Sequence, residues 1–250
     1  MPSRPPLIIH CMLPGGADDV LAARYFNPLL PPLARLRLSD PMHQSLRRWP
    51  EALGPAPASV RLVGGRLPIG YFEAQTRQAL HVCVLNDPEA AFLRLPAALA
   101  QLAPETVLRL TGLGPAMLAD LTPADRVLRL LSRPEVRRRQ IGVTARLLAG
   151  LPRLAGTTAP EACLLPAARA ALARIDVLAG VDEELDGFAA GLSATFGWPA
   201  PPLSLAPALP ALDAAPRDLP RPVRDALRAA LDLDLRLYDS ARDLLSVSAG

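Results

Sequence analysis

Short apolar runs alternate along this chain with longer segments of helical spacing. The runs cover residues 7–12, 60–63, 80–85 and 175–178. Runs of this length are typical of strands buried on both faces, and their alternation with helices predicts a mostly parallel sheet covered on both sides. We therefore expect an α/β three-layer fold, with a mostly parallel central sheet flanked by helices, in a single domain over residues 1–250.

Prolines separate the last helix from the rest of the chain. Residues 199–222 are too rich in proline for a helix or a central strand, so we expect an ordered extended connection or a surface flap. Residues 222–245 then carry an apolar stripe at helical spacing and begin with Pro222, which predicts a C-terminal helix.

A Pro-Gly-Gly turn follows the first apolar run and leads into a charged helix start at Asp18 and Asp19. A strand, a glycine-rich turn and a helix form a phosphate-binding loop when backbone N–H groups surround an anion and a lysine balances its charge. The same pattern also opens ordinary α/β domains. This chain contains 27 arginines and no lysine. Leu13 occupies the turn position where a lysine would be expected.

Residues 10–18, HCMLPGGAD, are similar to the motif His-(Ile/Val)-Pro-Lys-Thr-Gly-Gly-Thr-Ser, which opens the bacterial and Golgi-type carbohydrate sulfotransferases. Residues 81–94 resemble the strand of that family that runs into Leu-Arg-Asp-Pro, with Asn86 replacing the arginine and Arg94 replacing a later serine. Further similar segments occur in the order of the family, one between these two at 60–72 and the others after them at 144–150, 174–188, 196–199 and 236–245. The chain therefore resembles this family across residues 7–245.

This resemblance implies a P-loop-like fold and transfer of a sulfuryl group from 3′-phosphoadenosine 5′-phosphosulfate (PAPS) to a hydroxyl, usually on a sugar. In the family, the loop lysine neutralises charge on the bridging oxygen of the donor, and a histidine is the expected base. At these two catalytic positions the chain has Leu13 and Arg66. The donor-binding positions implied by the resemblance are Met12, Leu13, Pro14, Gly15, Gly16, Ala17, Asp18, Asn86, Arg94 and Arg146.

Several of these residues lack the chemistry that the reaction needs. Leu13 offers no cation at the leaving oxygen, Ala17 offers no hydroxyl, and Asp18 adds a negative charge where an anion would bind. Arg66 stays protonated at any working pH and so cannot be a base. Because the loss of one electrostatic donor typically costs ~10²–10³ in rate, we favour a degenerate sulfotransferase, kept as a binding or assembly protein.

The alternative is an active PAPS-dependent enzyme in which arginines replace the lysine. Its anion ligands would come from Arg61, Arg66, Arg94 or Arg146, and its base would be Glu73 or His43. A nucleotide-hydrolysing P-loop protein is less favoured, because Gly-Lys-Ser/Thr and a Walker-B type aspartate are missing. No cofactor is predicted apart from PAPS, or its product 3′-phosphoadenosine 5′-phosphate (PAP), in the active case.

Charge and composition narrow the choice of partners. The segment 125–153 is rich in arginine, which would attract a glycan or an acidic partner protein, or would simply form the solvated face of helices. Aromatic residues do not interleave with these arginines, which disfavours nucleic acid. Without an apolar run of roughly 20 residues or a secretory signal, we expect a cytoplasmic protein with no membrane span. The scattered cysteines and histidines indicate reduced core thiols and no metal site, and the oligomeric state does not follow from the sequence.

Overall fold

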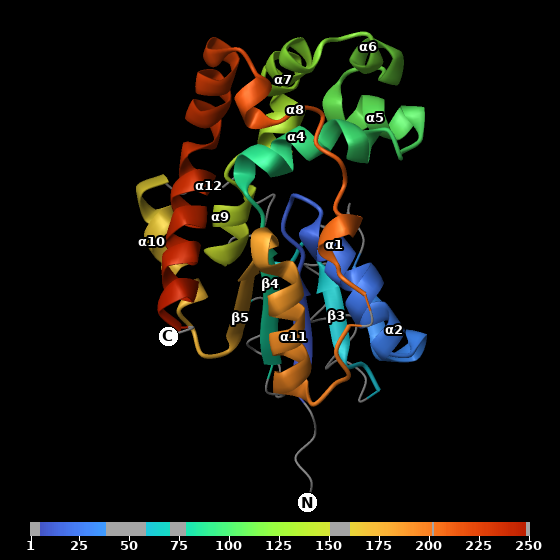
Figure 1. Cartoon of the computed structure of the whole chain (residues 1–250), viewed down its shortest axis with the longest axis vertical. Coiled ribbons are helices and arrows are strands. Elements are labelled where there is room, and N and C mark those ends of the chain that lie inside the picture. Colours follow the sequence, from blue (N-terminus) through green and yellow to red (C-terminus); the bar gives the residue numbers. More distant parts are fainter. Residues whose placement is uncertain (1–5, 39–58, 71–78, 151–160, 202, 249–250) are drawn as a thin grey trace, which may run out of the picture.

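Five parallel strands in the described residues form one sheet that is flanked by helices (Figure 1). The computed structural model describes residues 6–38, 59–70, 79–150, 161–201 and 203–248. Neighbouring strands follow the order β2-β3-β1-β4-β5, and every neighbouring pair is parallel. The strands are β1 Leu7–Cys11, β2 Arg35–Arg37, β3 Leu62–Gly65, β4 Ala79–Leu85 and β5 Val177–Val181. The predicted α/β fold with a parallel sheet between helices is confirmed, and β1 is the middle strand.

Each of the four predicted apolar runs overlaps one of these strands. The strand that the sequence did not reveal is β2, which contains Arg35, Leu36 and Arg37 and pairs with β3 alone. An edge strand of three residues, two of them charged, carries neither an apolar run nor an alternation long enough to detect.

The residues of β1 alternate between two hydrophobic cores, one on each face of the sheet. Leu7, Ile9 and Cys11 belong to the core formed with α9 Val143–Leu148, α10 Glu161–Leu172 and α12 Arg221–Ser248. Ile8 belongs to the core on the opposite face, which includes residues of α1 Ala17–Leu21, the π-helical turn η1 Ala22–Phe26 and α11 Leu185–Phe196. The short helix α2 Asn27–Leu29 continues directly from η1. This period of two is the pattern expected of a central strand buried on both faces.

A third core lies beyond the carboxyl ends of the strands, where five further helices and part of α12 gather (Figure 1). These helices are α4 Pro88–Leu99, α5 Pro104–Thr111, α6 Pro115–Ala119, α7 Pro123–Leu131 and α8 Pro134–Gln140. Each begins with a proline. The fixed φ of proline suits the first helical position, and the N–H that it lacks would have no helical partner there.

The Pro-rich segment 199–222 is an ordered connection in its described part and contains two 3₁₀ turns, η4 Ala206–Ala208 and η5 Pro216–Asp218. Two carboxylates fasten it to the body of the protein. Asp186 accepts the N–H of Leu205 at 2.5 Å, while Asp213 pairs with Arg126. The C-terminal helix α12 then starts at Arg221, with Pro222 in its first turn, close to the predicted boundary. Two further 3₁₀ turns are η2 Pro32–Ala34 and η3 Asp182–Glu184.

Candidate functional site

The turn between β1 and α1 depends on its two glycines. Gly15 and Gly16 have φ angles of 127° and 97°, in a region that side-chain-bearing residues rarely adopt. A Cβ on Gly15 would lie 2.3 Å from Cγ of Asn86, and a Cβ on Gly16 would lie 3.1 Å from Cδ of Pro210. Backbone conformation and packing therefore both require glycine here, and α1 begins at Ala17 as the sequence predicts.

The carboxylate of Asp18 is fully buried between this turn and the sheet. Its Oδ1 lies 2.7 Å from Nε2 of His10 and accepts the N–H of Val84 at 3.1 Å, and its Oδ2 accepts the N–H of Leu13 at 2.8 Å. Burial raises the pKa of the Asp18 carboxyl, while His10 and the two N–H groups oppose that shift. This corrects the expectation that Asp18 presents a negative charge to an anion at the turn, because its carboxyl group is buried and hydrogen-bonded within the protein.

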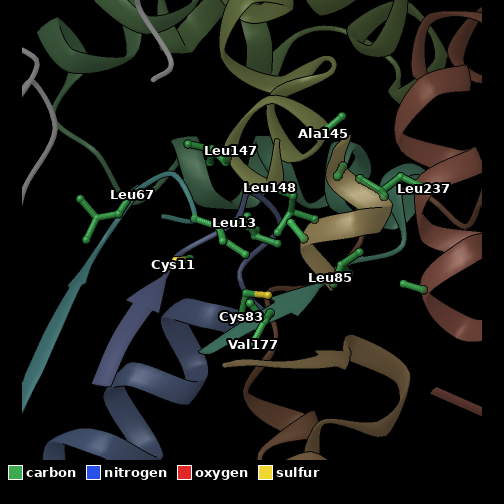
Figure 2. Close-up of a cluster of buried hydrophobic side chains, with 14 of the residues drawn as sticks. Cys11, Leu13, Leu67, Cys83, Leu85, Ala145, Leu147, Leu148, Val177 and Leu237 are labelled. Atoms are coloured by element: carbon green, nitrogen blue, oxygen red, sulfur yellow. The ribbon is translucent and has the colours of Figure 1, made fainter. Parts of the chain in front are cut away.

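The side chain of Leu13 lies in the hydrophobic core (Figure 2). It is 3% exposed and packs in the same cluster as Leu85 and Leu148. Met12 is also buried. The position that matches the lysine of the family therefore faces apolar side chains, so neither residue is placed to contact a bound donor through its side chain.

Asn86 closes the turn from the side of β4. Its Oδ1 accepts the N–H of Ala17 at 3.2 Å, and its Nδ2 donates to the carbonyl oxygen of Val84 at 3.3 Å. With Pro14, Asn86 borders a cavity of about 20 Å³, which has room for a water molecule but not for a nucleotide. Asn86 is therefore a structural amide where the resemblance suggested an anion ligand, and Ala17 is itself fully buried.

A larger, open pocket of about 380 Å³ lies against the Gly15–Gly16 turn. Three arginines line it, and they come from separate elements: Arg24 from η1, Arg66 from the segment after β3, and Arg94 from α4. The other charged or amide side chains among its described lining residues are Asp19 and Gln140. The carboxylate of Asp19 pairs with Arg37 at 3.1 Å. Arg94 is itself paired with the buried Asp182, but arginines still outnumber the acids on this side of the pocket, which gives it a positive charge suited to an anion.

Arg94 is held by a buried acid. Its Nη1 lies 2.9 Å from Oδ2 of Asp182, whose Oδ1 accepts the O–H of Tyr238 at 3.0 Å and the N–H of Asp87 at 3.0 Å. Burial, together with the Asp182 carboxylate, raises the pKa of Tyr238, so this hydroxyl keeps its proton and remains a donor. Asp182 thereby orients an arginine of the pocket and connects α4 to α12.

The remaining residues predicted for the site lie elsewhere. Arg146 donates to the carbonyl oxygen of Ile141 at 2.9 Å, and Arg61 is half-buried just before β3. Neither is among the described residues that line the pocket. Glu73 and His43, the alternative bases, fall outside the described residues. Of the predicted positions, the structure thus brings Gly15, Gly16, Arg66 and Arg94 together at one pocket.

Arg24, Asp19 and Gln140 were not anticipated as site residues. A local signal existed for Arg24 and Asp19, because Asp19, Val20, Ala23 and Arg24 have the spacing of one face of the helix that follows the turn. No local pattern identifies Gln140 or Pro210, since the folding of α8 and of the Pro-rich segment brings them to the pocket from distant parts of the chain.

The arginine-rich segment 125–153 divides into anchors and surface residues. Arg126 pairs with Asp213 and donates to the carbonyl oxygens of Leu118 and Leu121 at 2.7 and 2.8 Å. Arg129, Arg137 and Arg138 are exposed on α7 and α8, and Arg138 lies 3.8 Å from Glu135. Part of the cluster is therefore structural rather than available to a partner.

The cysteines are unpaired thiols. Cys11 and Cys83 are buried, as expected, and burial raises the pKa of both, whereas Cys163 is exposed. In the part of the chain that the structure describes, no group of His, Cys, Asp and Glu side chains is arranged to hold a metal ion. Nor does any helix within those ranges combine the length and apolar character needed to cross a membrane.

The chain matches no model of a known protein family, and no curated protein is significantly similar to it. The resemblance to sulfotransferases therefore stays a prediction from the sequence motifs.

Proposed function

We propose that this protein binds a phosphate- or sulfate-bearing ligand in the pocket beside Gly15 and Gly16, as a sulfotransferase-like protein with little or no sulfuryl transfer. The observation that supports this proposal is the presence of Arg24, Arg66 and Arg94 around one pocket at the turn. Guanidinium groups pair with phosphate and sulfate oxygens through charge-assisted hydrogen bonds, and arginine suits such recognition geometrically.

The arrangement favours binding over transfer. Sulfuryl transfer needs a cation at the leaving oxygen and an acceptor for the proton of the attacking hydroxyl. Leu13 lies in the core, and Arg66 cannot take up a proton. Among the described lining residues the acid is Asp19, whose carboxylate is already paired with Arg37.

The active enzyme is the second candidate, and the same arginines favour it. In that case Arg66 or Arg94 would neutralise the leaving group of PAPS, and Glu73 or His43 would be the base. The two candidates differ in whether PAPS is consumed. An active enzyme must bind PAPS, transfer its sulfuryl group and release PAP, whereas a binding protein need not.

A titration with PAP, followed by NMR chemical shifts, tests the site. We expect a Kd no better than ~100 μM, because a donor site that has lost two or three charged hydrogen bonds binds two to three decades more weakly than an intact one. Arg66→Gln and Arg94→Gln should each weaken binding about tenfold, while Arg236→Gln, an exposed arginine on α12, should leave binding unchanged.

A transfer assay with PAPS and glycan acceptors then separates the two candidates. We expect PAP to be released no faster with the protein than in buffer alone. A low-micromolar Kd together with PAP release that depends on Arg66 or Arg94 would establish the active enzyme instead. Equal binding by the wild type and both pocket variants would show that the arginines do not form an anion site.

A partner surface and a cytoplasmic location also belong to this proposal. Arg129, Arg137 and Arg138 are exposed on neighbouring helices and would attract a sulfated glycan or an acidic protein surface. Replacing all three with glutamine should reduce retention on a heparin column and leave the binding of PAP unchanged. The unpaired thiols suit a reducing compartment, and cell fractionation checks the location.

A further inference from the structure

Two helical faces of small aliphatic residues border the arginine-lined pocket. On the helix that follows the Gly15–Gly16 turn, Val20 and Ala23 lie beside Arg24. On α4, Arg94 has aliphatic lining neighbours at helical spacing, namely Ala91, Leu95 and Ala98. Residues three and four apart lie on the same face of a helix, so each face combines an arginine with aliphatic surface.

The Pro-rich connection adds aliphatic surface to the same pocket through Ala208 and Pro210. Pro210 lies close to the turn, since a Cβ on Gly16 would be 3.1 Å from its Cδ. Contacts on both sides of Ala208 and Pro210 hold this wall in place: Asp186 accepts the N–H of Leu205, and Asp213 pairs with Arg126.

No aromatic side chain is among the described residues that line the pocket. On the helix that carries Arg24, Tyr25 and Phe26 instead pack in the core with Trp198, with ring centroids 6.1 and 6.2 Å from it. A nucleobase would therefore meet no described ring to stack on, whereas an alkyl chain would bury its methylene groups against the aliphatic walls.

We infer that the ligand of this pocket is a phosphate or sulfate monoester of an aliphatic alcohol. The arginines bind its anionic group, and its chain lies against the aliphatic faces of the two helices. The inference rests on the proposed anion site and narrows the class of ligand that the site accepts. A volume of about 380 Å³ is sufficient for a small ligand of this kind.

A chain-length series provides the test. Inorganic phosphate and butyl, hexyl and octyl phosphate are titrated below their aggregation concentrations, together with octyl sulfate and PAP. Affinity should rise about threefold to fourfold for each methylene that is fully buried, so octyl phosphate should bind at least tenfold more tightly than butyl phosphate. Comparison of octyl sulfate with octyl phosphate shows which anion the arginines prefer.

Variants locate the effect in the pocket. Ala23→Gln and Ala98→Gln, one on each helical face, replace exposed alanines and should reduce the gain in affinity with chain length. Ala190→Gln on α11 is the matched control for an exposed helical alanine outside the pocket and should preserve the full gain. Arg94→Gln should weaken binding of every ester, which separates the pocket from adsorption elsewhere.

The outcomes distinguish this inference from the proposal on which it rests. If phosphate binds in a manner that depends on Arg66 and Arg94, but alkyl esters bind no more tightly than phosphate, the anion site stands and the aliphatic ligand is refuted. Binding of PAP more than tenfold tighter than octyl phosphate would also refute it. If none of the probes binds, both the anion site and the inference fail.

Discussion

Nη1 of Arg94 lies 2.9 Å from Oδ2 of Asp182, and the arginine lines the pocket while the acid is buried behind it. Because Tyr238 and the N–H of Asp87 bind the other carboxylate oxygen, Asp182 has its position fixed from three sides. An arginine held in this way loses little further side-chain entropy when it binds an anion. The pair therefore connects the stability of the α4–α12 contact to the binding properties of the pocket.

Asp182→Asn should weaken both stability and ligand binding. An asparagine removes the charge that balances Arg94, so we expect a loss of about 1–3 kcal/mol in the free energy of unfolding, measured in urea. The affinity for inorganic phosphate should fall severalfold, because Arg94 is no longer oriented. Tyr238→Phe removes one hydrogen bond to Asp182 and leaves the ion pair, so it should cost about 1 kcal/mol with a smaller change in affinity. If Tyr238→Phe lost as much phosphate affinity as Asp182→Asn, the ion pair would not be what orients Arg94.

Leu13→Lys tests whether the turn is a phosphate-binding loop that lacks only its lysine. The structure places this side chain in the core, so the variant should lose at least about 3 kcal/mol of stability, through lost apolar burial and the cost of burying an ammonium group. Leu13→Met, which preserves volume and apolar character, should cost less than about 1.5 kcal/mol. Thermal unfolding of both variants compares them. A stable lysine variant with tighter binding of PAP would show instead that position 13 reaches the ligand.

Gly15→Ala should destabilise the protein although it adds one methyl group. The φ of 127° disfavours alanine, and its Cβ would meet Asn86 at 2.3 Å, so a loss of at least about 2 kcal/mol is expected. Gly191→Ala in α11 is the matched control, because a Cβ there meets nothing within 4 Å. This control should stabilise the protein by up to about 1 kcal/mol through helix propensity. Urea unfolding of the two variants should therefore give shifts of opposite sign.

The sequence predicted the elements whose signals are local. The apolar run at 7–12 gave the central strand, the glycines gave the turn, and Pro222 gave the start of the last helix to within one residue. Arg66 and Arg94 were identified from their places in motifs, and both line the pocket. The direction of the Leu13 side chain was not predictable, because it depends on the backbone path through Pro14 and on the helices that cover this end of the sheet. Arg24 was not predicted because it lies outside the motif, in η1, beyond the short helix that follows the turn.

The buried pair of His10 and Asp18 predicts a dependence of stability on pH. Because burial raises the pKa of the Asp18 carboxyl above its ordinary value of 3.8, the native state holds this proton at pH values where the unfolded chain has released it. The stabilisation from the protonated carboxyl is therefore fully present below pH 3.8 and is lost as the pH rises through the raised pKa, by at most about 1.4 kcal/mol per pH unit.

Asp18→Asn removes this titration. Asp18 accepts the N–H groups of Leu13 and Val84 on two different oxygens, whereas an asparagine amide has only one oxygen. The variant should therefore lose one of these hydrogen bonds and be less stable by about 1–3 kcal/mol at acid pH. The difference in the free energy of unfolding between the wild type and the variant should then narrow from pH 4.5 to pH 7.5. Urea unfolding at each pH measures this difference. A difference that widens with pH would show that the native state favours the ionised carboxylate of Asp18. In that case the carboxylate, rather than the neutral acid, is the form that holds the turn closed against the sheet.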